Sequence, residues 1–225
     1  MKRSAFDRTA RQLAEIGKRF YSRGWVLGTS GNFSAVVERK PLRFAITASS
    51  VAKGSLARAD ILQCDERGRV VGRRGKPSAE TLLHVEVVRR RGAGAVLHTH
   101  SVWSTMLSES WAGRTDGALV IEGYEMLKGL AGVASHDHRE VVPILENDQD
   151  IPRLAVRVGE TLDRHPDAHA FLLRRHGLYT WGETLADAER HVEILEFLFE
   201  VVGRNSLDRG AADPSRMQGG LAWRS

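Results

Sequence analysis

Two pairs of histidines in this chain have the spacing that metal ligands use. His98 and His100 lie in "AVLHTHS", and His136 and His138 lie in "SHDHRE". Residues i and i+2 of a strand point to the same face, so two imidazoles at the end of an apolar strand can reach one ion. "SHDHRE" has polar, turn-like surroundings and no apolar run to hold its backbone. We therefore favour the first pair, although one such pair is unsurprising in a chain with nine histidines.

A metal ion held by the first pair needs a third ligand, and His176 is a candidate. It follows an apolar strand pattern in "LLRRHGLYTW" and precedes a Gly turn, and strand ends on one side of a sheet can converge. Taken alone, His176 is better interpreted as a half-buried turn residue. His165, His169 and His191 lie on predicted helices or at a helix end, and we interpret them as solvated or core histidines.

Two acids stand at predicted helix starts. Glu80 follows Ser78, a residue typical of helix N-caps, and shares a helix face with His84 at i,i+4. Glu125 begins a short helix in "GYEMLKG". Either acid could simply be stabilised by the helix dipole, or could be a catalytic or metal-adjacent carboxylate. Spacing does not decide between these interpretations.

Two loops of small residues could bind a phosphate. "GTSGN" (28–32) and "TASS" (47–50) each offer backbone N–H groups and hydroxyls. Neither has the Gly-Lys-Ser/Thr ending of a Walker loop or the G-x-G-x-x-G pattern, so ordinary turns remain an alternative. Lys53 and the Ser78 hydroxyl could contribute to the same anion site.

The elements that must position these residues are mixed helices and strands, read from hydrophobic periodicity and turn residues. Helices are predicted at 4–23, 78–92, 151–166 and 184–204. Strands are predicted at 42–50, 95–100, 118–123 and 141–146, after a turn within 28–37, and as two strands turning at Gly177 within 168–183. Residues 59–77 are predicted as a strand, a turn at 66–68, a short strand and a basic loop. One central sheet with helices on its faces is the expected architecture. We expect one domain over 1–206 and a loosely ordered tail over 207–225, which is rich in Gly, Ser and Arg.

Composition narrows the setting. No apolar run approaches the roughly 18 residues that a membrane span needs, and the charged N-terminus does not look like a secretory signal. The single cysteine, Cys64, predicts a reduced, cytoplasmic protein. A net charge of +5 suits anionic small molecules. A nucleic-acid binder is the weaker alternative, because no aromatic residues interleave the basic clusters.

Five of these signals occur in a fixed order: "GTSGN", "ITASS", "SAE", "HTH" and "RRHG". In this order they resemble the class II aldolase family of zinc-dependent sugar-phosphate aldolases and epimerases. The stretches "GWVLGTSGNFS", "RGAGAVLHTHS", "YEMLKG", "VVPILEN" and "RRHGLYTWGET" are similar to the dehydratases of this family that act in methionine salvage. The resemblance covers roughly residues 10 to 203.

The resemblance implies an α/β/α three-layer sandwich with a mainly antiparallel central sheet. It implies a homo-oligomer, usually a tetramer, with sites near subunit interfaces and one zinc ion per subunit. The implied zinc ligands are His98, His100 and His176, and the pair in "SHDHRE" matches none of them. The implied phosphate-binding residues are Thr29, Ser30, Gly31, Asn32, Thr47, Ser49, Ser50, Lys53 and Ser78.

The two acids also acquire roles from the resemblance. Glu125 matches the acid/base of the dehydratases, and Glu80 matches a carboxylate on or beside the metal in the aldolases. Because that second position is not acidic in some dehydratases, the role of Glu80 stays open.

The expected activity is dehydration of 5-methylthioribulose 1-phosphate to 5-methylthio-2,3-dioxopentyl phosphate, through an enediolate that the metal stabilises. The alternative within the family is an aldolase or epimerase acting on another sugar phosphate. A non-catalytic scaffold of the same fold is a further alternative, but such a protein has no need of three histidines at the ligand positions.

Overall fold

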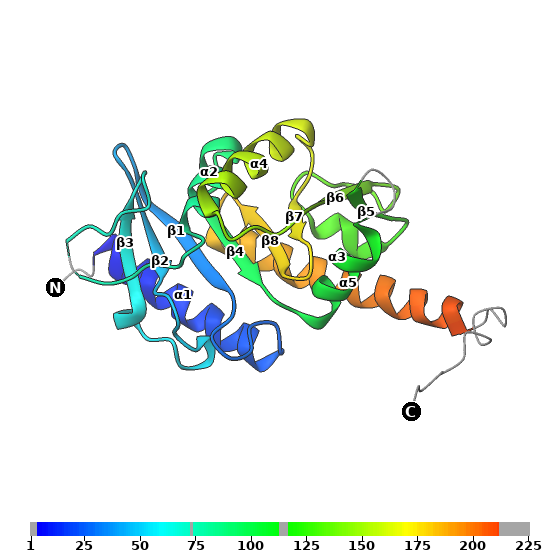
Figure 1. The fold of residues 1–225 in the computed structure, drawn as a ribbon, viewed down its shortest axis with the longest axis horizontal. Helices are drawn as coiled ribbons and strands as arrows, with labels where there is room; N and C mark the ends of the chain where they lie inside the picture. The colour runs from blue at the N-terminus through cyan, green and yellow to red at the C-terminus, as the bar shows by residue number, and fades with distance from the viewer. Residues whose placement is uncertain (1–3, 73, 113–116, 212–225) are drawn as a thin grey trace, which may run out of the picture.

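The computed structural model describes residues 4–72, 74–112 and 117–211. Its centre is one eight-stranded sheet with the strand order β3-β2-β1-β4-β8-β7-β6-β5 (Figure 1). The strands are β1 (Asn32–Arg39), β2 (Leu42–Thr47), β3 (Ile61–Asp65), β4 (Ala95–Thr99), β5 (Ala118–Glu122), β6 (Arg139–Leu145), β7 (Ala170–Leu173) and β8 (Gly177–Gly182). Only β6 and β7 pair in parallel, so the prediction of a mainly antiparallel sheet is confirmed.

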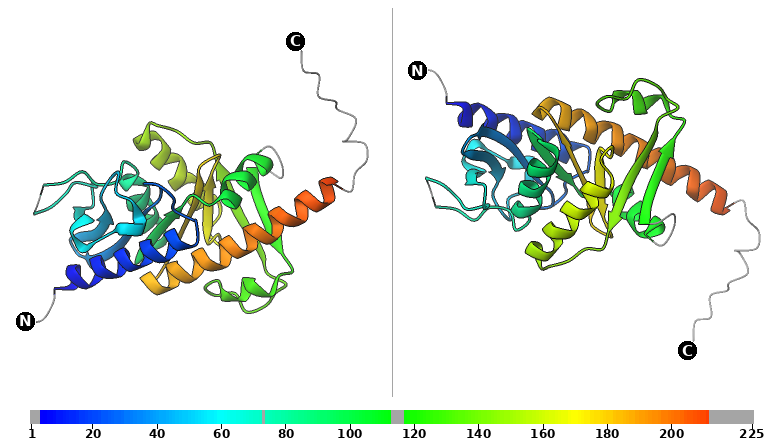
Figure 2. Two further views of the ribbon diagram at one scale, coloured as in Figure 1. Left: turned by 90° about the horizontal axis from the view of Figure 1, so that it is seen from below. Right: turned by 90° about the horizontal axis from the view of Figure 1, so that it is seen from above.

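Helices cover both faces of this sheet. They are α1 (Ala5–Ser22), α2 (Thr81–Arg91), α3 (Val102–Trp111), α4 (Ile151–Arg164) and α5 (Leu185–Ala211), with short 3-10 helices η1 (Lys53–Ser55), η2 (Arg58–Asp60) and η4 (Glu125–Gly129). One buried core joins α1 and α5 to the sheet, and another joins α2 and α4 to its opposite face (Figure 2). The three-layer sandwich is therefore confirmed.

Alternation along β4 sorts its side chains between these two layers. Val96 packs in the core under α2 and α4, and Leu97 packs in the core under α1 and α5. His98 then faces the α2 side, whereas the Thr99 hydroxyl donates a 2.6 Å hydrogen bond to Glu196 of α5. The sequence "HTH" thus places its imidazoles on one side of the sheet and its threonine on the other.

The start of α2 differs from the prediction. Ser78 does not cap the helix, because α2 begins only at Thr81, with Glu80 at the N-cap position. The Ser78 hydroxyl accepts from the backbone N–H of Glu80 at 3.3 Å, and its carbonyl accepts from that of Thr81 at 3.2 Å. Residues 78–80 are therefore a turn before the helix. The C-terminal end is as predicted, since Gly92 adopts the left-handed conformation with φ 60°.

Three further details depart from the sequence prediction. Helix α3 was not predicted, although Ser101 caps it by accepting from the Ser104 N–H at 3.0 Å. The short strand after the turn at 66–68 is reduced to a single bridge between Cys64 and Val70. Helix α5 continues to Ala211, past its predicted end at 204, and residues 212–225 of the predicted tail lie outside the described residues.

Candidate metal centre

The pairing of β4 with β8 brings three histidines together. Thr99 of β4 lies opposite Leu178 of β8, so the end of one strand meets the beginning of the other. The Nε2 atom of His98 lies 2.7 Å from Nε2 of His100 and 3.3 Å from Nε2 of His176. The three imidazoles predicted from the sequence therefore point to one place.

Two glycines permit the close approach of the backbones around this cluster. A Cβ on Gly177 would lie 2.0 Å from the carbonyl oxygen of Thr99, which no larger residue can tolerate. Gly31 has φ +73°, and a Cβ there would lie 2.7 Å from the carbonyl oxygen of His98. The two loops that carry these glycines are thus packed directly against the strand end that carries the histidines.

The ring of His98 is fixed from two directions. Its Nδ1–H donates to the carbonyl oxygen of Leu178 at 2.8 Å, which leaves Nε2 unprotonated in the neutral ring. The ring stacks on Tyr179 with a centroid distance of 3.9 Å and an interplanar angle of 14°. A backbone carbonyl behind a metal-binding imidazole is the arrangement that orients such ligands in known sites.

The lowered pKa values of the three histidines keep the rings neutral and so able to bind a cation. Burial lowers the pKa of His100 to about 3 and holds the pKa of His98 well below its usual value. Burial also lowers the pKa of His176. Three neutral imidazoles are the donor set of catalytic zinc sites that keep an open position, so these residues fit a zinc ion.

Glu80 lies beside the three imidazoles. One of its carboxylate oxygens is 3.5 Å from Nε2 of His98, and the other is 3.4 Å from Nε2 of His176. This is the position that the family resemblance implies, on or next to a bound ion.

A chain of hydrogen bonds orients Glu80. Asn32 donates from Nδ2 to the Glu80 carboxylate at 2.6 Å, so its Oδ1 is left to accept from Nε2–H of His84. Nδ1 of His84 then accepts from the Ser34 hydroxyl at 2.7 Å. Burial lowers the pKa of His84 to about 3, which keeps this ring neutral.

These hydrogen bonds from Ser34 through His84 and Asn32 to Glu80 were not predicted from the sequence. Their signals were the i,i+4 spacing of Glu80 and His84 on α2 and the i,i+2 spacing of Asn32 and Ser34 on β1. Both ring nitrogens of His84 are used within the chain, so His84 is a support for Glu80 and not a ligand.

The cluster opens into a cavity of about 430 Å³. Every predicted phosphate-binding residue except Thr47 lines it: Thr29, Ser30, Gly31, Asn32, Ser49, Ser50, Lys53 and Ser78. Glu80, His100 and His176 line it as well. A segment that sequence reasoning did not single out, Asn147–Gln149 with Ile151 at the start of α4, forms another part of its wall.

Three of the predicted phosphate residues have structural contacts of their own. Thr47 is fully buried, and its hydroxyl accepts from the backbone N–H of Phe33 at 3.2 Å, so it does not reach the cavity. The side chain of Asn32 is committed to Glu80. Lys53 donates from Nζ to the carbonyl oxygens of Thr29 and Val51 at 2.9 and 2.7 Å, and burial lowers its pKa to about 8.

The structure does not bring Glu125 to the three histidines. Glu125 is the first residue of η4, its side chain is 74% exposed, and it does not line the cavity. Lys128 donates to it at 2.6 Å and lowers its pKa. Within one chain, the only predicted acid beside the histidine cluster is therefore Glu80.

Comparison with known proteins agrees with this geometry. The family model for the class II aldolase and adducin N-terminal domain matches residues 11–202. The chain belongs to the class II aldolase family. A family member in Methylococcus capsulatus named "Methylthioribulose-1-phosphate dehydratase" is 50% identical over 200 residues, covering 88% of this chain and 95% of the relative. A protein of the same name in Pseudomonas syringae pv. syringae is 46% identical over 190 residues, covering 84% and 91%.

Solved class II aldolases share the fold. An L-fuculose-1-phosphate aldolase from Thermus thermophilus superposes with a TM-score of 0.70 at 27% identity, covering 92% of this chain and 98% of that one. Another L-fuculose 1-phosphate aldolase gives 0.72 at 22% identity, covering 92% and 88%. In the described ranges, no helix has the length and apolarity to cross a membrane.

Proposed function

We propose that this class II aldolase family member removes water from 5-methylthioribulose 1-phosphate to give 5-methylthio-2,3-dioxopentyl phosphate, as a lyase of methionine salvage. The observation that carries the proposal is a three-histidine cluster, of which His100 and His176 line a cavity that Gly and Ser loops also line. It occurs in a chain half identical to a protein named for this activity. We propose the cytoplasm as its compartment, because the single cysteine, Cys64, is buried and unpaired.

The cofactor in this proposal is one zinc ion per subunit, held by His98, His100 and His176. Zinc would polarise the C2 carbonyl of the substrate and so make the C3 proton more acidic. The histidines contribute neutral nitrogens and leave the full cationic charge for that purpose.

The loops that line the cavity would hold the phosphate. Backbone N–H groups and hydroxyls around Thr29–Gly31 and Ser49–Ser50 can donate to a phosphate without adding a formal charge. Lys53 holds the carbonyl of Thr29 and thereby the shape of the first loop. Fixing the phosphate fixes which substrate carbon faces the histidines, which is the main contribution of such loops to the rate.

Two proton transfers are needed, and we assign both to Glu125. It would take the proton from C3 and return it to the C4 hydroxyl, which leaves as water; the resulting enol becomes the 2,3-diketone. Glu80 lies within 3.5 Å of two of the histidines and is held by Asn32, so its proposed part is to shape the site from the side.

Because Glu125 is exposed and remote from the cavity of its own chain, we propose that it acts in the site of a neighbouring subunit. The family resemblance implies a homo-oligomer with sites near subunit interfaces. Met126 beside Glu125 is 39% exposed, and Phe197 is 48% exposed on α5, the helix that packs against η4. Large apolar side chains exposed in this way fit an interface.

The first test is the reaction itself. Purified protein should convert 5-methylthioribulose 1-phosphate to the diketone, lose this activity with a chelator and regain it with zinc. Release of a three-carbon fragment would instead identify an aldolase, the activity that the two solved neighbours are named for. Turnover that survives complete metal removal would contradict the proposal.

The second test asks whose Glu125 serves each site. His98→Ala and Glu125→Gln should each be inactive alone. Co-expressed with different tags and isolated as mixed oligomers, they should regain about a quarter of the wild-type activity, the share of sites that random assembly leaves with an intact metal centre and a neighbour's Glu125. If mixed oligomers stay inactive while mixing with wild type behaves normally, Glu125 does not act across an interface.

A further inference from the structure

A second cluster of potential ligands lies away from the cavity. In the described part of the chain, His138, Glu140 and His169 are the other group whose ligand atoms all lie within 4.8 Å of one another. Glu140 belongs to β6, and His169 immediately precedes β7, the strand paired in parallel with β6. None of the three lines the cavity of the first cluster.

The two imidazoles of this cluster approach the same carboxylate oxygen of Glu140. Oε2 of Glu140 lies 2.8 Å from Nε2 of His138 and 2.8 Å from Nδ1 of His169. The other oxygen, Oε1, accepts from the backbone N–H of His169 at 2.9 Å, so Oε2 alone faces the two rings. We propose that His138, Glu140 and His169 bind a second divalent transition-metal ion, of which zinc is the expected occupant.

The surroundings of the cluster are those of a built metal site. Nε2–H of His169 donates to the carbonyl oxygen of Ala131 at 2.8 Å, which directs the Nδ1 lone pair toward Glu140. This is the outer contact that metal-binding imidazoles make in known sites. Glu140 is 1% exposed, so its negative charge needs a cation close by, whereas the His138 side chain is 26% exposed and leaves access from solvent.

The donor set also selects the class of ion. Two imidazoles and one carboxylate suit zinc, cobalt or nickel, while calcium and magnesium prefer oxygen ligands throughout. A carboxylate in the ligand set lowers the net charge of the site. Because the cluster lies outside the cavity, we expect this ion to be structural.

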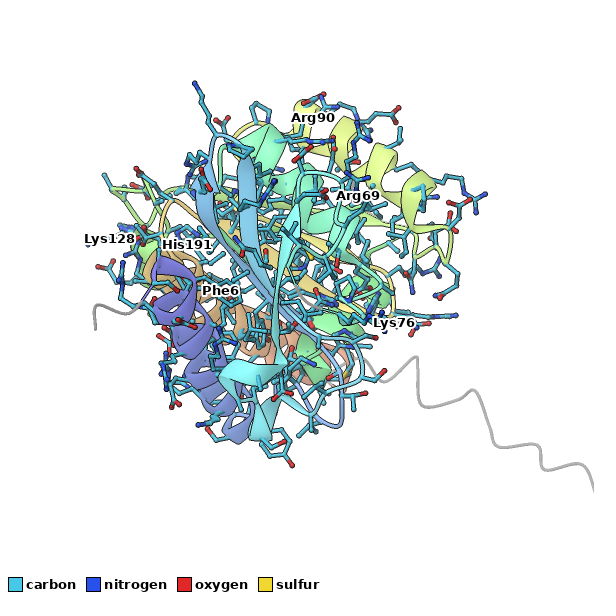
Figure 3. All side chains as sticks on the ribbon, turned by 90° about the vertical axis from the view of Figure 1, so that its left-hand side faces the viewer. Phe6, Arg69, Lys76, Arg90, Lys128 and His191 are labelled. Carbon is cyan, nitrogen blue, oxygen red and sulfur yellow. The ribbon has the colours of Figure 1, made fainter. Side chains whose placement is uncertain are left out.

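An ion here would hold the segment that follows η4. Both backbone polar groups of Ala131 are hydrogen-bonded to side chains. Its carbonyl oxygen accepts from His169, and its N–H donates to Nε2 of His191 at 3.0 Å. Arg190 of α5 donates to the carbonyl of Gly129, the last residue of η4. Lys128 of η4 and His191 of α5 lie at the same edge of the molecule in Figure 3.

The competing occupant of the cluster is a proton. Although burial opposes it, the Glu140 carboxylate raises the pKa of His169, and a doubly protonated His169 would donate to both Glu140 and Ala131. A proton on His169 would be stabilised by Glu140 alone and gives no reason for a second imidazole at the same oxygen. A metal ion needs several ligands, and His138 supplies one, so the convergence of three ligand atoms favours the ion.

The experiment counts zinc by elemental analysis after equilibration in zinc buffer and dialysis. Wild type should hold about two ions per chain, and the double variant His98→Ala with His100→Ala should hold about one. Adding His138→Ala to that double variant should remove the last ion and the stabilisation by zinc in thermal unfolding. Cobalt in the double variant should give the visible absorption of a low-coordinate site with nitrogen ligands.

Matched variants keep the result clear of folding defects. His136 is two residues from His138 and has an exposed side chain, so His136→Ala should keep both ions. Glu140→Gln keeps the size of the buried side chain and should lose one ion. Wild type holding one ion, with none in the double variant, would overturn the proposal and leave His169 and Glu140 as an ion pair. Because the readout is zinc content, loss of the proposed dehydratase activity would not affect it.

Discussion

The two histidine clusters of this protein have the same i,i+2 spacing but differ in charge and in position. In the first, His98 and His100 are two residues apart at the end of a strand; in the second, His138 and Glu140 are two residues apart at the start of one. The first cluster is neutral and opens into the cavity, while the second contains a buried carboxylate and lies outside it. A cluster without an acid leaves the full charge of a bound ion available for a substrate, whereas one carboxylate lowers that charge by one.

The largest effect should come from the first cluster. His98→Ala should lose the catalytic zinc and reduce kcat/KM by about 10³-fold or more, because carbonyl polarisation is lost. His138→Ala should keep near wild-type kcat/KM in the same assay. Zinc content measured beside the kinetics decides the comparison: an inactive His138→Ala with its first ion intact would show that the second cluster takes part in the reaction.

The next effect tests the close approach of β4 and β8. Gly177→Ala places a Cβ 2.0 Å from the Thr99 carbonyl, so the strands must separate where the histidines meet. We expect a loss of about 3 kcal/mol in the free energy of unfolding and weaker zinc binding at the first cluster only. Gly54→Ala is a matched control, because its Cβ meets only the exposed ring of Tyr21. Equal denaturation midpoints for the two variants would contradict this account.

A smaller effect concerns the support of Glu80. His84→Phe removes the donor to Asn32, so Glu80 should lose its fixed orientation while the three ligands remain. The kcat should fall about 10- to 100-fold, as for other groups that orient metal ligands, with both zinc ions retained. His165→Ala, outside the chain of hydrogen bonds, should leave kcat unchanged. Full activity of His84→Phe would remove His84 from any positioning role.

The smallest effect concerns two buried carboxylates, Glu196 next to the first cluster and Glu140 within the second. Burial raises the pKa of Glu196, which accepts from Thr99 between the two ligands, to about 7 from a usual value of 4.5. His169 instead holds the pKa of Glu140 below its usual value despite burial. Because the unfolded chain ionises Glu196 first, its contribution to stability is lost as the pH rises from about 4.5 to about 7, and it changes no further above that.

Glu196→Gln should remove this pH dependence. The variant should be more stable than wild type by about 1–2 kcal/mol at pH 8 and no more stable near pH 4. Urea denaturation at several pH values measures the difference. An advantage that is the same at pH 4 and pH 8 would show that folding does not raise the pKa of Glu196.

Local patterns in the sequence predicted most elements and two residues of the first histidine cluster. Periodicity marks α1, α4 and α5, and Gly92 marks the end of α2. The i,i+2 spacing of His98 and His100 is a local property of a strand, so it could be read without the fold. Position after an apolar strand made His176 only a candidate third ligand, and the resemblance to the family selected it. It is 76 residues from His100, and strand register makes the link.

The sequence by itself determined which residue types stand at strand ends, which loops are small enough to approach a ligand, and the family. Tertiary structure alone decided how they combine. It showed that Ser78 precedes the helix without capping it, that Thr47 faces the interior, and that Glu125 is remote from its own chain's cavity. It also separated His136 from His138 and joined the latter to Glu140 and His169. The physical reason is that these outcomes depend on contacts between residues far apart in the chain, which no local spacing specifies.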